Sequence, residues 1–369
     1  MLNKKLIIVD STCNLLLAVQ LKRTVLSEDD VDLILGYTCL EERRNNKVLN
    51  RIFSDVFYFG QEKDYIWHIS HLLSPGRAIK DMIGDDQPRK YSDIFFWNPD
   101  YFMYYFFKFY KIIHHSVKWH VYGDAISQYL ADVPDIDPAF PEKMWMGRIL
   151  NRIDWLFWKV PRGNIAKMHY DFYMFQPEKF FAVPQKEHKG IPTINAEDTR
   201  TVSLFNEIFN YRYEEIKEKV IYIDTARDGN VDSDEIIGVL RKIQQHIGKD
   251  NLVVKPHPRV DLSIYSQLDL NFLDKSIPWE LYCMNGGLDG KVIACQFSSA
   301  VCLSYFWFNQ FTELVSVMKF TKSDSTYGGI ELNILKQIKE DTGKVFLPNS
   351  MEELMKDIDT AIDSIGKYY

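Results

Sequence analysis

Residues 219–259 carry the sequence KVIYIDTARDGNVDSDEIIGVLRKIQQHIGKDNLVVKPHPR. The apolar run at 219–223 predicts a buried strand, and 251–255 predict a second one. Between them, residues 233–246 predict a helix that begins at Ser233, an N-cap residue followed by acidic residues in the first turn. A strand, a helix and a second strand in this order predict a parallel pair joined by a crossover helix.

The same alternation continues on both sides of this stretch. In the first half of the chain, apolar runs predict strands over 6–9, 31–35, 56–59, 93–97 and 117–122. In the second half they predict strands over 291–295 and 314–317, and a terminal helix over 351–365. Residues 134–192 hold seven prolines, and we expect them to form an end cap and a crossing linker.

The two alternating halves predict an α/β chain of two doubly wound, Rossmann-like domains that face each other across a cleft. We expect an N-terminal domain over residues 1–180, a linker over 181–215 and a C-terminal domain over 216–369. Ligands of doubly wound sheets bind beyond the carboxyl ends of the strands. The polar residues that follow each strand are therefore the candidates for function.

Composition excludes several classes of protein. The chain has 369 residues, of which 46% are hydrophobic and 26% charged, as in ordinary globular proteins of two or three domains. The net charge of −7 argues against a general nucleic-acid binder. Five cysteines without CxxC spacing fit a reduced, cytoplasmic chain better than a disulfide framework. No apolar run is long enough for a membrane span, and the apolar run near the start is too short for a signal peptide.

The motif Val253-Val-Lys-Pro-His-Pro-Arg259 follows the second strand of the opening stretch. Its prolines hold the backbone extended and restrict His257. Lys255, His257 and Arg259 offer three cationic or donor groups within five residues, which suits a phosphate. The alternative is a rigid strand exit whose charges are simply solvated.

Two serines follow a later strand, in Cys295-Gln-Phe-Ser-Ser-Ala-Val301. Ser298 and Ser299 open a helical run, where hydroxyl groups, free backbone N–H groups and the positive end of the helix dipole can hold an anion. The alternative is that one serine only caps the helix.

Acidic residues follow two further strands. Asp228 precedes Gly229 on the loop after the strand at 219–223, and Asp124 follows the strand at 117–122. A carboxylate at such a position can act as a general base. The alternatives are an ordinary Asp-Gly turn and an acid at a helix N-terminus.

We expect no metal site. Three D-x-D patterns occur, at 135–137, 232–234 and 357–359, but the second fits a first helical turn and the third lies within the terminal helix. The pair His114-His115 has no Cys or acidic residue at metal-ligand spacing.

The segment 144–158 is rich in tryptophan. Trp145, Ile149 and Leu156 fall at near-helical spacing, and Arg148 and Arg152 lie among them. A helix of this kind can lie on a membrane surface. The same pattern is typical of a core or crossing helix, because amphipathicity is common to surface helices in general.

The order of these motifs resembles bacterial sialyltransferases of the two-domain GT-B type, closest to the lipooligosaccharide and capsule sialyltransferase group (glycosyltransferase family 52). The segments that carry the resemblance are Gly123-Asp124-Ala125, Ile277-Pro-Trp-Glu280, His257-Pro258 and Ser298-Ser299. They are similar to the group's acid-acid-Gly, I-P-x-E, His-Pro and serine motifs. The resemblance covers roughly residues 117–305.

One departure affects the catalytic base. The first acid of the acid-acid-Gly motif, which is the base in several relatives, is replaced by Gly123, and the motif's glycine by Ala125. The resemblance to the lipooligosaccharide group implies a base in the second domain, at Asp228. Asp124 is the second choice.

The resemblance implies inverting transfer of sialic acid from CMP-sialic acid to a galactose-type hydroxyl of a surface oligosaccharide, without a metal or other cofactor. It implies His257 and Asp228 as catalytic residues. The donor would contact Lys255, Pro258, Arg259, Gly229, Glu280, Ser298 and Ser299. We expect a cytoplasmic enzyme, with peripheral membrane contact and a homodimer both compatible with the sequence.

Two other functions fit the same residues. A phosphotransferase of the teichoic-acid polymerase type also has K-x-H-P and a later serine segment, but transfers a polyol phosphate from its CDP ester. A non-catalytic nucleotide- or glycan-binding protein would account for Gly123 and Ala125.

Overall fold

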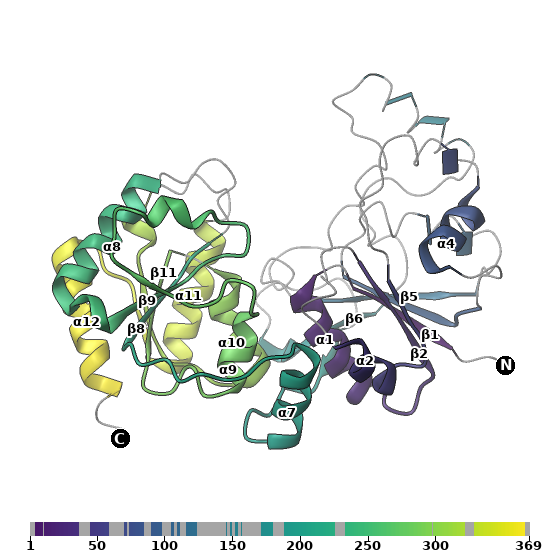
Figure 1. Cartoon of the computed structure of the whole chain (residues 1–369), viewed down its shortest axis with the longest axis horizontal. Helices are drawn as coiled ribbons and strands as arrows, with labels where there is room; N and C mark the ends of the chain where they lie inside the picture. Colours follow the sequence, from purple (N-terminus) through teal and green to yellow (C-terminus); the bar gives the residue numbers. More distant parts are fainter. Residues whose placement is uncertain are drawn as a thin grey trace. The chain divides into compact units, whose positions relative to one another are not determined.

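The structure is a computed structural model of the chain, and it describes residues 4–9, 11–36, 45–58, 70–71, 74–84, 90–97, 105–106, 109–110, 116–123, 145, 148–149, 152–153, 156, 171–179, 188–225, 233–296, 298–321 and 328–365. It divides into two compact units (Figure 1). The first contains Met1–Thr193 and Glu207–Asn210, and the second contains Ile194–Asn206 and Tyr211–Tyr369.

The first unit is built on a seven-stranded sheet in the order β3-β2-β1-β4-β5-β6-β7, in which every pair of neighbours is parallel. The strands are β1 (Lys5–Val9), β2 (Val31–Leu35), β3 (Val56–Tyr58), β4 (Asp93–Phe96), β5 (Lys118–Tyr122), β6 (Phe172–Phe175) and β7 (His188–Ile191). Its helices include α1 (Thr12–Arg23), α2 (Asn46–Ile52) and α4 (Pro75–Ile83). The strand order changes direction at β1 and β4, as in a doubly wound sheet.

A partly buried ionic cluster joins β4, β5 and the start of β6. His120 Nε2 lies 2.8 Å from Asp93 Oδ1, and His120 Nδ1 lies 3.5 Å from Asp171 Oδ2. The Ser92 hydroxyl donates to Asp93 Oδ2 at 2.6 Å. Burial opposes ionisation of Asp93, but the hydrogen bonds from His120 and Ser92 and the nearby positive charges lower its pKa to about 2. The cluster therefore stabilises this unit through an ionised Asp93.

Replacing Asp93 by Asn is expected to destabilise the first unit by about 2 kcal/mol at pH 7. A depressed carboxyl pKa adds stability above the unfolded value near 4, and this stability is lost as the pH falls toward 2. In urea titrations the difference between wild type and variant should shrink to below about 1 kcal/mol at pH 2.5. Asp269→Asn is the control, because the Asp269 side chain is 82% exposed in its pair with Lys249. A difference that does not change with pH would contradict the prediction.

The second unit is built on a six-stranded parallel sheet in the order β10-β9-β8-β11-β12-β13. The strands are β8 (Val220–Ile223), β9 (Leu252–Lys255), β10 (Asn271–Phe272), β11 (Val292–Cys295), β12 (Glu313–Ser316) and β13 (Val345–Phe346). The helices are α7 (Thr199–Ile208), whose last two residues are grouped with the first unit, α8 (Ser233–Ile247), α9 (Trp279–Met284), α10 (Ser299–Phe308), α11 (Gly328–Thr342) and α12 (Met351–Ile365).

Helices cover both faces of this sheet. On one face lie α8 and α12 (Figure 1). Their buried side chains Leu240 and Ile358 belong to one cluster with Val220 and Val292 of the sheet. On the other face, α9 and α10 pack against each other and against β11 and β12. The apolar positions of α8 and α12 recur every three or four residues, which is why each helix buries only one side. Both faces are thus closed, and the strand ends remain as places for a ligand.

The expected fold class is confirmed, since both halves are parallel, doubly wound α/β sheets. The expected end cap and linker over 134–192 is wrong in part, because β6 and β7 add to the first sheet within this range. Phe172–Phe175 is a run of aromatic residues and Met that forms a strand in spite of the flanking prolines. The segment 181–215, which we expected to link the two domains, contains β7 and α7.

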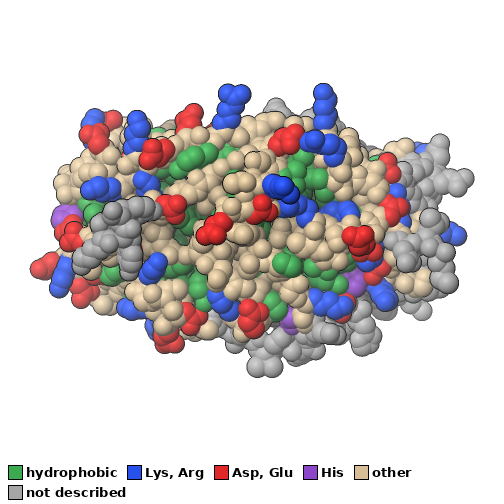
Figure 2. Space-filling model, turned by 90° about the horizontal axis from the view of Figure 1, so that it is seen from below, with side chains coloured by type: hydrophobic (Ala, Val, Ile, Leu, Met, Phe, Trp, Pro, Cys, Tyr) green, Lys and Arg blue, Asp and Glu red, His purple; other side chains and the backbone are tan. Residues whose placement is uncertain are grey.

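Charged side chains of both signs are interspersed over the face of the molecule shown in Figure 2. Among the residues that the structure describes, no helix has the length and apolar character needed to cross a membrane.

Candidate functional site

Three neighbouring strands of the second sheet end at one edge, which we call the carboxyl edge. β9 ends at Lys255, β8 at Ile223 and β11 at Cys295, and β8 lies between the other two. Neighbouring strands are about 4.8 Å apart, so the ends of β9 and β11 are about 10 Å apart. The segments that contain His257 and Ser298 therefore leave the sheet on either side of β8, within the reach of one phosphorylated ligand.

The turn after β9 fixes the orientation of the His257 ring. The Arg259 backbone N–H donates to His257 Nδ1 at 3.2 Å, and the Val260 N–H donates to the His257 carbonyl at 3.0 Å. Because Nδ1 accepts, the proton of the neutral ring is on Nε2. The ring is half-buried, whereas Pro258 and Arg259 are exposed. The turn thus orients the ring so that Nδ1 accepts from the backbone and Nε2 is the ring nitrogen that can donate to a ligand.

Lys255 differs from the other basic residues of the motif because its side chain is buried, with the residue only 4% exposed. Its Nζ lies 5.9 Å from the centre of the Tyr282 ring. Burial lowers the pKa of Lys255 to about 8, against the opposing charges of Glu280 and Asp274. Solvent exposure therefore increases along the motif, because Lys255 is buried, His257 is half-buried and Arg259 is exposed. Because it is buried, Lys255 can act on a ligand mainly through the electrostatic field of its ammonium group.

The burial of Lys255 predicts a stability that rises at alkaline pH. The unfolded lysine keeps its proton to about pH 10.4, whereas the folded one loses it near pH 8. Because the neutral amine is easier to bury than the ammonium group, the free-energy cost of burying Lys255 falls as the pH rises between these values. The free energy of unfolding of wild type, minus that of Lys255→Met, should increase by about 2 kcal/mol from pH 7.5 to pH 9.5. The subtraction removes the contribution of tyrosine ionisation. Lys249→Met, at a lysine whose side chain is 59% exposed, should show no such change, and the same flat profile for Lys255→Met would disprove the prediction.

Glu280 is placed by the short helix α9. Pro278 precedes the helix, and Glu280 lies in its first turn with the residue 5% exposed. The helix ends in a tight turn, in which the Gly287 N–H donates to the Tyr282 carbonyl at 2.7 Å. This turn keeps α9 short, and it holds Glu280 and Tyr282 next to Lys255.

Gly287→Ala is expected to destabilise the second unit by about 1–3 kcal/mol. A Cβ at this position would lie 2.5 Å from the Tyr282 carbonyl oxygen, so the backbone would have to shift. Gly238→Ala in α8 is the matched control, because its Cβ would meet nothing within 4 Å and alanine favours a helix. Thermal unfolding of both variants checks the prediction, and equal melting temperatures would contradict it.

The helix α10 begins directly after β11. Ser298 is its N-cap, half-buried and in extended conformation, and its side chain makes no capping hydrogen bond. Ser299 is the first helical residue, and its side chain lies outside the described set. Since the Ser298 hydroxyl does not cap the helix, helix capping by its side chain does not explain why a serine occupies position 298. The helix dipole and the first N–H groups of this ten-residue helix favour an anion here.

We compared the whole chain with known proteins, and several solved structures share this architecture. The GT-B domain of a sialyltransferase from Photobacterium damselae matches with a TM-score of 0.51 at 13% identity, over 93% of this chain and 97% of that one. UGT2 from Phytolacca americana, solved with UDP-2-fluoro-glucose and pterostilbene, matches with a TM-score of 0.51 at 11% identity, over 99% and 92%. MnaA from S. aureus, solved with UDP, matches with a TM-score of 0.51 at 9% identity, over 98% and 88%. The chain has the GT-B fold. No family model and no curated protein matches the sequence.

Sequence reasoning missed four residues at the carboxyl edge of this GT-B chain. The Tyr265 hydroxyl donates to Asp224 Oδ2 at 2.6 Å, and the Asp224 N–H donates to the Lys255 carbonyl at 3.0 Å. The Thr225 hydroxyl donates to Gln296 Oε1 at 3.3 Å, which joins the segments after β8 and β11. Asp224 and Gln296 are buried, and each directly follows a strand, which is the signal that could have found them.

Three predicted residues and the departure at Ala125 lie outside the described part of the chain. They are Asp228 and Gly229, between β8 and α8 in the sequence, and Asp124, which follows β5. Gly123 is described and buried, and its N–H donates to the Tyr173 carbonyl at 2.9 Å. The position of the catalytic base therefore stays a prediction.

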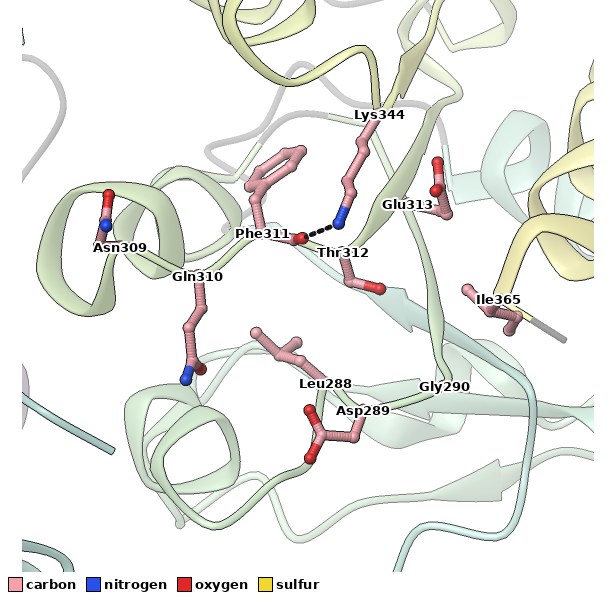
Figure 3. Close-up of a pocket in the computed structure, with 10 residues that line it drawn as sticks. All are labelled: Leu288, Asp289, Gly290, Asn309, Gln310, Phe311, Thr312, Glu313, Lys344 and Ile365. Atoms are coloured by element: carbon pink, nitrogen blue, oxygen red, sulfur yellow. Dashed lines mark hydrogen bonds between the residues drawn. The ribbon is translucent and has the colours of Figure 1, made fainter. Parts of the chain in front are cut away.

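The pocket of Figure 3 lies at the opposite, amino edge of the same sheet. It has a volume of about 520 Å³ and lies between the residues that precede β11, β12 and β13. Lys344 Nζ donates to the Phe311 carbonyl at its rim, at 3.0 Å. None of the predicted site residues lines this pocket. Among the described residues, no group of three or more His, Cys, Asp or Glu side chains is arranged to hold a metal ion.

Proposed function

We propose that this GT-B protein is an inverting glycosyltransferase that moves sialic acid from CMP-sialic acid to a galactose-type hydroxyl of a surface glycan. The observation that carries the proposal is the position of His257 and Ser298 at the ends of β9 and β11, on either side of β8. Their orientation supports it, because His257 offers Nε2–H and Ser298 offers a hydroxyl that does not cap its helix.

A CMP ester suits these groups because its leaving group carries a single phosphate. When the bond between the anomeric carbon and the phosphate oxygen breaks, the electron pair and the negative charge go to that oxygen. His257 Nε2–H, Ser298, Ser299 and the first N–H groups of α10 stabilise this charge. Exposed Arg259 adds a bidentate donor, with Pro258 shaping the turn between it and His257. Lys255 raises the electrostatic potential at the phosphate, and Glu280, which is equally buried, acts on the donor through its charge next to Lys255.

The acceptor hydroxyl attacks the anomeric carbon from the face opposite CMP, which inverts its configuration. A carboxylate takes the hydroxyl proton as the new bond forms. We assign this role to Asp228, next to Gly229, with Asp124 as second choice. The oligosaccharide acceptor and CMP-sialic acid are thus the two partners in the reaction.

Donor selectivity tests the proposal. The protein is incubated with CMP-sialic acid, CDP-glycerol or UDP-glucose, each with lactose-type and polyol-phosphate acceptors, and release of CMP or UDP is measured. We expect CMP release from CMP-sialic acid that depends on the sugar acceptor, together with a sialylated product. Release from CDP-glycerol alone would establish the polyol-phosphate transferase instead. Binding of CMP without turnover of any donor would establish a non-catalytic nucleotide-binding protein.

A further inference from the structure

Four apolar residues form an exposed stripe in the tryptophan-rich segment. We define the Trp145 stripe as Trp145, Ile149, Ile153 and Leu156, which are 71%, 45%, 37% and 65% exposed. They are four of the nine large apolar residues that are exposed among the described residues of the chain. Burial in the core, the alternative that the sequence left open for this segment, does not apply to these four.

The spacing of the stripe places it on one side of a helix. All four residues are in helical conformation, as are Arg148 and Arg152. At the helical spacing of about 100° per residue, the four apolar positions fall within an arc of about 80°. A helix of a globular protein normally turns such an arc toward the core. Here the arc is turned toward solvent, so folding does not account for it.

Arginines border the same arc. Arg148 and Arg152 are exposed, and both fall within about 60° of Trp145 on the same side. The chain as a whole carries a charge of −7, so this basic border runs against the overall balance. An arc of Trp, Ile and Leu bordered by Arg is the pattern of a helix that lies in a bilayer interface, with arginines at the level of anionic headgroups.

We propose that the Trp145 stripe, with Arg148 and Arg152, binds the surface of an anionic lipid bilayer. The area favours lipid over a second protein. At these exposures the four side chains offer on the order of 450 Å², whereas a stable protein interface needs about 800 Å² from each partner. Lipid contact needs no matching surface and gains from the basic border. The proposal is independent of the donor, because lipid binding is measured without substrates.

Sedimentation with vesicles tests the proposal on the full chain. Wild type should bind vesicles of phosphatidylcholine with 30% phosphatidylglycerol. Its binding to vesicles of phosphatidylcholine alone should be at least about fivefold weaker. The double variant Trp145→Glu/Leu156→Glu should lower the partition coefficient about tenfold or more. Arg148→Glu/Arg152→Glu should lower binding to anionic vesicles by a similar factor at low salt. Trp145→Phe, which keeps an apolar ring, should retain most of the binding.

Matched controls separate the stripe from general effects of charge. Val25→Glu puts an acid at another exposed apolar position, and Lys47→Glu reverses another exposed cation. Both should bind vesicles like wild type, and circular dichroism should show that every variant is folded. Wild type that does not sediment with anionic vesicles, or equal binding to both vesicle types, would overturn the proposal. It would also be overturned if the stripe variants changed the oligomeric state and left lipid binding intact, since the stripe would then contact a second copy.

Discussion

His257→Ala is expected to lower kcat/KM for CMP-sialic acid by about 10²–10³-fold, the usual effect of removing one donor that stabilises developing charge. The Arg259 N–H donates to Nδ1. We therefore expect Nε2–H to donate to the phosphate oxygen that takes up charge as CMP leaves. The fold should be unaffected, because the residue is only half-buried and the backbone hydrogen bond from the Val260 N–H to the carbonyl of residue 257 is kept in the variant. Initial rates of CMP release at saturating acceptor measure the effect.

His246→Ala is the matched control for this substitution. His246 lies near the end of α8, and its Nε2 is 2.9 Å from Asp359 Oδ1, in a partly exposed pair away from the carboxyl edge. We expect its rate to remain within about twofold of wild type, since exposed pairs contribute little. If His257→Ala lost no more activity than His246→Ala, His257 would have no role at the phosphate.

Asp228→Asn is expected to lower kcat by about 10²–10⁴-fold, the range for loss of a general base, while CMP affinity stays within about threefold. An amide keeps the size of the side chain but cannot accept the proton of the acceptor hydroxyl. The separation of the two effects matters, because a residue that bound the donor would lose affinity as well. Single-turnover rates and calorimetric titration of CMP measure the two quantities.

Asp124→Asn is the direct comparison, since Asp124 is the other candidate for the base. If Asp228 is the base, Asp124→Asn should keep at least a tenth of the wild-type rate. The opposite ranking would assign the proton transfer to the first domain, where Gly123 and Ala125 depart from the sialyltransferase motif that this segment resembles. A rate unchanged in both variants would exclude both carboxylates.

The elements that the sequence predicts well are those with strong local patterns. The strand over 219–223, the helix that starts at Ser233 and the strand over 251–255 correspond to β8, α8 and β9. Long apolar runs and an N-cap followed by acids specify such elements without tertiary contacts. The two-residue strands β10 and β13 were missed because two residues are too few for any periodic signal.

β6 and β7 were missed for another reason. They occur in a proline-rich segment, and the sequence of β7, HKGI, has little strand character. The strand forms because β6 offers it a hydrogen-bonding edge, and Lys189 Nζ pairs with Asp171 Oδ2 at 2.5 Å. Pairing partners far apart in sequence are invisible to local patterns.

At the site, the order of motifs predicts which loops matter but not how deeply each side chain lies. The sequence gives no sign that Lys255, His257 and Arg259 differ in burial, yet Lys255 is buried and Arg259 is exposed. Glu280 and Tyr282, which act on the Lys255 ammonium, come from α9, later in the chain. The Trp145 stripe shows the same limit, because spacing alone does not tell a core face from a surface face.

Calorimetric titration of CMP and of cytidine, into wild type and His257→Ala, tests the central claim most directly. The claim is that the carboxyl edge of the second sheet holds the phosphate of a cytidine nucleotide between His257 and the start of α10. Wild type should therefore bind CMP more tightly than cytidine. His257→Ala should lower the affinity for CMP by about tenfold or more and leave the affinity for cytidine unchanged. Equal affinities for CMP and cytidine in wild type, or a variant that loses both ligands alike, would contradict the account.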